Sequence, residues 1–89
     1  MKRGTYNHEI TREIIKLARL SRNKTQSEFG DICGVHQTCI AHLESGYMDI
    51  TVNLQSKLKD GFRRLRISNE EIELFKRAAD IKKVRGYKI

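Results

Sequence analysis

Residues 26–45 read QSEFGDICGVHQTCIAHLES, and this stretch decides how the chain folds. It contains two short patterns of apolar residues at helical spacing, separated by Gly34, which can adopt the φ > 0 conformation that ends a helix. The apolar residues are Phe29, Ile32 and Cys33 in the first pattern and Val35, Ile40 and Leu43 in the second. Two helices joined by a short turn that contains glycine form a helix-turn-helix motif.

The rest of the chain supplies further helices that support this motif. Asn7 is an expected N-cap for a first helix from about His8 to Arg22, and Asn23 can stop that helix in a left-handed conformation. Thr25 and Glu28 form a capping box before the second helix. The other expected helices are Gln26 to Cys33, Gln37 to Ser45 with Gly46 behind it, a fourth that follows Thr51 and carries an apolar stripe to Leu65, and Asn69 to Val84.

The length of 89 residues allows one domain with one modest core. We therefore expect a single all-α domain over residues 1–89, with its core at about 8–84, a basic arm at 1–6 and a basic tail at 85–89. The chain shows neither an apolar leader pattern at its beginning nor a run of about 18 apolar residues. The two cysteines lie in apolar patterns, as reduced core thiols do, so we expect a cytoplasmic, nucleoid-associated protein with no membrane contact.

The net charge of +7 is unevenly distributed along the chain. Residues 1–24 carry +5, residues 25–50 carry −4 and residues 51–89 carry +6. A basic chain of this size is suited to a polyanion such as nucleic acid, although a charge run is also often a solvated face. If the chain binds DNA, the attraction must come from the flanks of the motif.

The third expected helix has a polar face without lysine or arginine. At 100° per residue, five neutral or weakly basic side chains fall on one side of this helix. They are Gln37, Thr38, Ala41, His42 and Ser45. Amide, hydroxyl, imidazole and methyl groups are those that read base edges in a major groove.

Residues 15–72 resemble the Cro/repressor-like (XRE-type) helix-turn-helix family, a five-helix DNA-binding module of bacteria and phages. The matching positions are Thr25-Gln26, Gly30, Gly34, Val35, Ile40, Leu43, Glu44-x-Gly46 and Leu65-x-Ile67-Ser68. The resemblance implies a lambda-repressor-like fold in which Gly30, Gly34 and Gly46 serve structure. It also implies an ion pair between Arg19 and Glu44 that ties the first helix to the third.

The same resemblance implies a set of DNA contacts. Gln37 and Thr38 would read bases, with His42 one turn further along, and Gln26 would bond a phosphate and brace Gln37. Further DNA-binding candidates are His36, Ala41, Ser45, Arg22, Lys24 and Tyr47. His36 stands at the N-cap where Ser or Thr is usual, so that its cap is weak or its imidazole faces a phosphate.

Two other kinds of site have less support. Cys33, His36, Cys39 and His42 are spaced three apart, but steps of three rotate by 300° around a helix and do not bring the four side chains together. We therefore expect no metal and no cofactor. Gly-rich phosphate loops, HExxH and nucleophile elbows are missing from the sequence, so an enzyme is not expected.

The function that these patterns predict is sequence-specific binding of double-stranded DNA. We expect a transcriptional regulator, in particular a bacterial or phage repressor that binds an inverted repeat as a homodimer. The fifth helix and the tail are the expected dimer surface, unless their apolar residues only close the monomer core. The alternative is an antitoxin or interaction module whose partner is a protein, such as a toxin or an antirepressor.

Overall fold

The computed structural model describes residues 9–85, and for residues 82–85 it describes the backbone alone. Five helices follow one another: α1 (Arg12–Ser21), α2 (Gln26–Cys33), α3 (Gln37–Ser45), α4 (Val52–Arg64) and α5 (Asn69–Arg85). The all-α, five-helix fold expected from the sequence is confirmed. The predicted bounds of α2 and α3 agree with the structure, and α5 ends one residue later than predicted.

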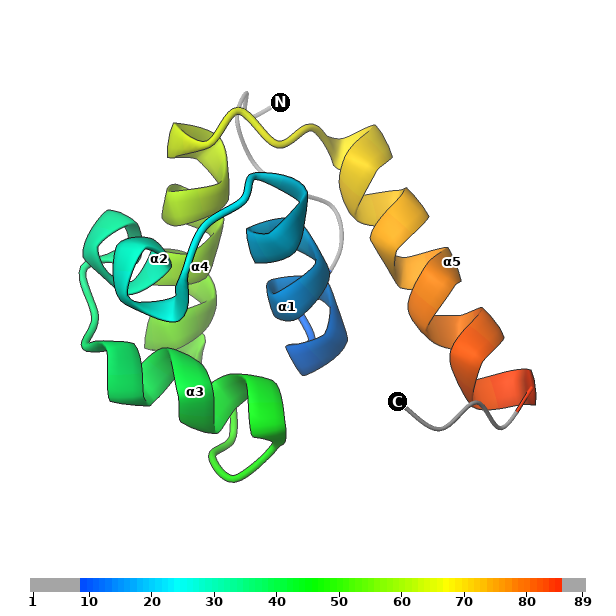
Figure 1. Cartoon of the computed structure of the whole chain (residues 1–89), viewed down its shortest axis with the longest axis horizontal. Coiled ribbons are helices and arrows are strands. Elements are labelled where there is room, and N and C mark those ends of the chain that lie inside the picture. The colour runs from blue at the N-terminus through cyan, green and yellow to red at the C-terminus, as the bar shows by residue number, and fades with distance from the viewer. Residues whose placement is uncertain (1–8, 86–89) are drawn as a thin grey trace.

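Helix α1 lies at the centre of the molecule (Figure 1). Helices α2, α3 and α4 gather on one side of it, and α5 lies on the other side. Contacts join α2 to α3 and α4, and join α1 to α3 and α5. The position of α3 is therefore set from two directions, by its partner in the motif and by α1.

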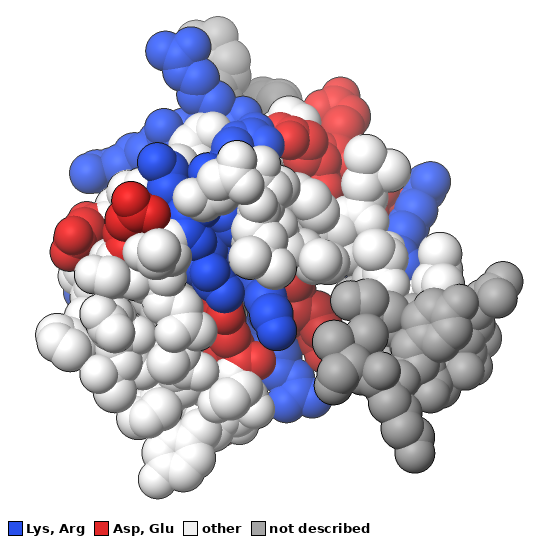
Figure 2. All heavy atoms as spheres, in the orientation of Figure 1, with Lys and Arg blue, Asp and Glu red and all other residues white. Residues whose placement is uncertain are grey.

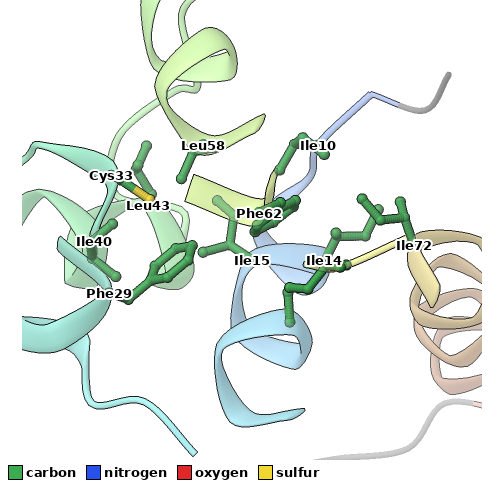
Figure 3. Packing of buried hydrophobic residues seen from close by; sticks show 12 residues of the cluster. Ile10, Ile14, Ile15, Phe29, Cys33, Ile40, Leu43, Leu58, Phe62 and Ile72 are labelled. Atoms are coloured by element: carbon green, nitrogen blue, oxygen red, sulfur yellow. The ribbon is translucent and has the colours of Figure 1, made fainter. Parts of the chain in front are cut away.

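One hydrophobic core joins all five helices (Figure 3). The rings of Phe29 in α2 and Phe62 in α4 stack with their centroids 5.9 Å apart, and Ile14 in α1 points towards Ile72 in α5. The buried core residues are Ile10, Ile14, Ile15, Ala18, Phe29, Cys33, Ile40, Leu43, Leu58, Phe62, Ile67 and Ile72. Because aromatic and branched side chains bury large apolar areas, this cluster supplies the main stabilisation of the fold.

The first helix begins four residues later than the sequence suggested. Its N-cap is Thr11, whose hydroxyl accepts a hydrogen bond from the backbone N–H of Ile14. The predicted start at His8 is wrong because Ile10, which fits the apolar period, is buried from a non-helical segment. The proposed cap Asn7 lies outside the described residues, as do the arm and residues 86–89 of the tail. Asn23 has a φ of 56°, so the predicted left-handed stop after this helix is confirmed.

The segment before α1 is held by a side chain of α4. The amide of Gln55 accepts from the N–H of Ile10 at 3.2 Å and donates to its carbonyl oxygen at 2.7 Å. One glutamine thus satisfies both backbone polar groups of a residue that is only 1% exposed. This pair of bonds explains how Ile10 enters the core without belonging to a helix.

The apolar residues of α5 divide between the core and the surface. Ile72 and Ala79 are buried and Phe75 packs against the core, whereas Leu74 and Ile81 are 59% and 53% exposed. Closing the monomer core therefore accounts for only part of the apolar surface of this helix. The exposed pair remains available to a partner.

Two glycines allow close approach between helices. A Cβ on Gly30 would lie 2.7 Å from the carbonyl oxygen of Val35, and a Cβ on Gly61 would overlap Sγ of Cys33. Gly61 lies inside α4, where a glycine costs up to about 1 kcal/mol relative to alanine. In the folded chain it gives α4 room to pack directly on α2.

We expect Gly30→Ala to lower the free energy of unfolding by about 1–3 kcal/mol, the usual cost of overpacking. The added methyl group would meet backbone atoms of the turn into α3, which cannot rotate away as a side chain can. Urea denaturation measures this change. Asp31→Ala, at an exposed position of the same helix, is the control and should stay within about 0.5 kcal/mol. Equal stability of the two variants would contradict the close approach at Gly30.

Candidate nucleic-acid interface

Helix α3 is capped at both ends by residues that the sequence marks. His36 is its N-cap, and Nδ1 of the imidazole accepts from the N–H of Thr38 at 3.1 Å. Gly46 ends the helix in the left-handed conformation with φ of 81°. Since Nδ1 of His36 is engaged by the backbone, the cap is formed, and the imidazole has Nε2 left for an outside group.

The outer face of α3 is open to solvent at the predicted positions. His36, Gln37, Thr38 and Ser45 are exposed, and Ala41 and His42 are partly buried. Ile40 and Leu43 on the opposite face are buried in the core. The structure therefore gathers the predicted base-reading residues on a single accessible surface.

A charged cluster fixes α3 against α1. Arg19 Nε and an Arg19 terminal nitrogen donate to the two carboxylate oxygens of Glu44 at 2.7 and 3.0 Å. The other terminal nitrogen of Arg19 donates to the carbonyl oxygen of Lys24 at 2.9 Å. The side chains of Arg19 and Glu44 are only 11% and 5% exposed. The ion pair expected between them is thus present, and it is bidentate and largely shielded from water.

Gln26 belongs to the same cluster, which corrects its expected role as a brace for Gln37. Its amide nitrogen donates to Glu44 at 3.2 Å, and among the described residues it forms no bond to Gln37. Because a carboxylate only accepts hydrogen bonds, the Gln26 NH₂ group must face Glu44. The amide oxygen and one remaining N–H are left for an outside partner.

Arg22, a predicted contact to the DNA backbone, also has a structural role. Its guanidinium forms a bidentate pair with Glu71 at 2.8 and 2.9 Å. It also donates to the carbonyl oxygens of Leu65 and Arg66 and to the hydroxyl of Ser21. All five N–H donors of Arg22 therefore have partners inside the protein, so that a bond to a phosphate would have to replace one of them.

Sequence patterns do not predict the bond between Arg22 and Glu71. Glu71 also forms a capping box with Ser68, with bonds of 3.0 and 3.1 Å. The pairing joins residues 49 positions apart, beyond the reach of helical spacing rules. Both partners lie next to helix ends, which was the only available signal.

The remaining predicted contacts lie around the ends of the motif. Lys24 is partly buried, and its backbone carbonyl accepts from Arg19. Tyr47 is 80% exposed, and its ring lies against His42 with the two centroids 4.7 Å apart. Tyr47 thus extends the surface of α3 beyond the end of the helix.

Charge is distributed over the surface as the sequence suggested. In Figure 2, Lys and Arg side chains gather in a band across α1 and above it, whereas the surface over α3 at the lower left shows neither sign of charge. The exposed face of α3 can therefore discriminate by hydrogen bonds and shape. Attraction to a polyanion must come from the cationic surroundings.

Comparison with known families identifies the domain that contains α2 and α3. Residues 15–58 match the family model described as Helix-turn-helix. These residues form a Cro/repressor-like helix-turn-helix domain. The matched segment runs from α1 into α4 and includes both helices of the motif. No curated protein sequence and no solved structure gives a significant match.

Membership in this family gives the helix-turn-helix domain a general function. The family binds DNA and is not a family of enzymes. If this domain binds DNA as its family does, the exposed face of α3 would be the surface that contacts the double helix. Among residues 9–85, no helix combines the length and the apolar character that crossing a bilayer requires.

The cysteines and histidines of the helix-turn-helix domain lie in different surroundings. Cys33 is buried against α4, and desolvation there raises the pKa of its thiol to about 12. His36 caps α3, while His42 contacts Tyr47 at the other end of this helix. Within the described part of the chain, no three His, Cys, Asp or Glu side chains lie close enough to share a metal ion.

The bond between Arg22 and Glu71 makes the stability of the helix-turn-helix domain depend on pH. The Arg22 guanidinium, and then the backbone N–H of Ser68, lower the pKa of Glu71 below its ordinary value of 4.5. A carboxyl group with a lowered folded-state pKa stabilises the fold fully above its unfolded pKa. That contribution is lost as the pH falls from 4.5 through the folded-state pKa.

We expect Glu71→Gln to reduce the free energy of unfolding most at neutral pH. The difference from the unsubstituted chain should shrink steadily once the pH falls below 4.5, the ordinary pKa of the group. Glutamine can still form a capping box, so the comparison isolates the charge on Glu71. Urea denaturation between about pH 3 and pH 7 spans this window. A difference that stays constant across the series would contradict the assignment.

Proposed function

We propose that this protein is a transcriptional repressor of bacterial or phage type that binds an inverted-repeat operator as a homodimer. The whole chain, residues 1–89, would act as one cytoplasmic, nucleoid-associated DNA-binding domain. The basic arm and tail would add attraction to the phosphate backbone without reading sequence. The observation that carries the proposal is the uncharged, hydrogen-bonding face of α3, held at a fixed angle by a shielded ion pair.

Gln37 and Thr38 are the foremost base-reading residues in this proposal. Both are exposed in the first turn of α3, where recognition helices of this motif contact base edges. Among the described residues, the side chain of Gln37 has no hydrogen-bond partner, so its amide oxygen and its NH₂ group are both available to a base. A glutamine can bond adenine bidentately and contribute about 1–3 kcal/mol of discrimination.

Gln26 supports this surface from the start of α2. Its bond to Glu44 leaves an amide oxygen and one N–H facing outwards. The backbone N–H groups at the beginning of α2 form a local anion site that is suited to phosphate. Gln26 would then fix the register of the domain on DNA through the remaining N–H.

The exposed apolar residues of α5 support the proposed dimer. Leu74 and Ile81 are more than half exposed and seven residues apart, so they lie on the same side of the helix. A second copy would cover them in the proposed dimer, and dimers of this motif bind half-sites about one turn of DNA, or about 34 Å, apart. That spacing predicts an operator with two-fold symmetry.

One observation favours a second candidate, an antitoxin or interaction module that acts through a protein. Residues 25–50 contain four acidic residues and no lysine or arginine, which is unusual for a surface that approaches phosphate. A toxin or antirepressor with a basic surface could contact this segment. The dependence of DNA binding on salt separates the two functions.

Selection from random duplexes with the full chain, followed by binding at two salt concentrations, tests the proposal. We expect enrichment of an inverted repeat and a loss of affinity of at least about tenfold between 50 and 200 mM salt, because several phosphates release counterions. A protein that enriches no sequence and fails to bind even at low salt would favour the interaction module. An enriched site without two-fold symmetry would remove the homodimer alone.

We expect Gln37→Ala to relax base preference at one position of each half-site and to cost about 1–3 kcal/mol on the selected operator. Stability should remain unchanged, because the side chain is exposed. Competition with duplexes that carry single base-pair changes measures the preference. Glu70→Ala, an exposed truncation on α5, is the control and should leave the preference intact. An unaltered preference profile for Gln37→Ala would remove this residue from readout.

A further inference from the structure

The chain after α3 folds back so that the ring of Tyr47 lies against His42, one of the proposed base-reading residues. With Gly46 in the left-handed conformation, the N–H of Tyr47 donates to the carbonyl oxygen of His42 at 3.0 Å. The N–H of Gly46 donates to the carbonyl oxygen of Leu43 at 3.3 Å. These two bonds are the Schellman arrangement, which brings the residue after the glycine beside the residue five positions before it.

In this chain those two positions hold Tyr47 and His42. Their ring centroids are 4.7 Å apart with an angle of 49° between the planes, which is a tilted aromatic contact. The hydroxyl of Ser45 strengthens the same turn by donating to the carbonyl oxygen of His42 at 3.2 Å and accepting from the Tyr47 N–H at 3.4 Å. The backbone of the cap therefore fixes where the tyrosine ring can lie.

We infer that Tyr47 is a positioning residue that holds the imidazole of His42 in its base-reading orientation. This inference rests on the proposed DNA-binding function. Tyr47 is 80% exposed, so its ring contributes little to the core. Its ring contacts the imidazole ring of His42. An imidazole on a helix surface can occupy several rotamers, and a neighbouring ring that excludes some of them reduces the entropy lost on binding.

A purely structural role for the contact makes a different prediction. Apolar contacts between these two positions commonly accompany the Schellman motif and stabilise the helix end. Such a contact would change the stability of the domain without changing which base it prefers. A phosphate contact by the Tyr47 hydroxyl would weaken binding to all sequences alike. Base preference at the position read by His42 is therefore the measurement that separates the three roles.

The test is a double-mutant cycle with His42→Ala, Tyr47→Ala and the double variant, measured on the selected operator and on duplexes with single base-pair changes. We expect His42→Ala to raise Kd about tenfold and to abolish preference at one base pair. Tyr47→Ala should lose preference at the same base pair. The double variant should bind within about twofold of His42→Ala, because the two residues act as one unit.

Tyr47→Phe is the matched control, because it keeps the ring and removes only the hydroxyl. It should retain the preference of the unsubstituted chain. In the free protein, NMR should show ring-current shifts of the His42 ring protons that persist in Tyr47→Phe and disappear in Tyr47→Ala. Thermal unfolding of each variant shows that the fold is retained, as the exposure of Tyr47 leads us to expect.

Any one of four results would overturn the inference. Additive effects in the cycle, or a uniform loss of affinity in both Tyr47 variants, would show that Tyr47 acts by itself. Unchanged base preference in Tyr47→Ala would leave the ring contact as a helix cap only. If the unsubstituted chain bound no DNA at low salt, the proposed function would fail together with the inference. If base preference depended on Gln37 but the cycle of His42 and Tyr47 were additive, the inference alone would fail.

Discussion

The ion pair between Arg19 and Glu44 is the constraint on which the reading surface depends. It joins the central helix to α3 through two short charged hydrogen bonds, and a third bond from Arg19 reaches the turn before α2. A pair that is this shielded has a high desolvation cost, and hydrophobic residues of similar size can give equal or greater stability. What the charged pair adds is direction, because a bidentate contact fixes the angle between two helices more narrowly than apolar packing does. Gln26 completes the arrangement by bonding the same carboxylate.

In this fold, the side chains that would attract DNA lie apart from those that would discriminate between DNA sequences. The face of α3 carries amide, hydroxyl and imidazole groups, while the Lys and Arg side chains lie on the surrounding surface (Figure 2). A phosphate-binding charge attracts any DNA equally, so a reading surface without such charges does not favour wrong sequences. Under the proposed function, the cationic flanks would set the overall affinity and α3 would set the preference among sites. Salt concentration would act mainly on the first of these properties.

Local signals in the sequence were sufficient for most helix ends and for the motif itself. Thr25, Gly34 and Gly46 act through bonds or backbone conformations within a few residues, and each has the predicted place. The start of α1 was missed because Ile10 fits a helical period but enters the core from a segment held by Gln55, 45 residues away. The bond between Arg22 and Glu71 was missed for the same reason, since Glu71 is distant in sequence. Family resemblance supplied the distant pair of Arg19 and Glu44, which spacing alone would not have given.

The contact between Gly61 and Cys33 has a consequence for the chemistry of the thiol. The sulfur lies where a side chain on α4 would otherwise be, so α4 covers it closely. Its reaction requires the thiolate, and burial raises the pKa of Cys33 to about 12. We therefore expect alkylating or oxidising reagents to react with this atom mainly when α2 and α4 separate. The rate of Cys33 modification therefore reports how often the domain opens. The residue that reports this opening is part of the helix-turn-helix motif itself.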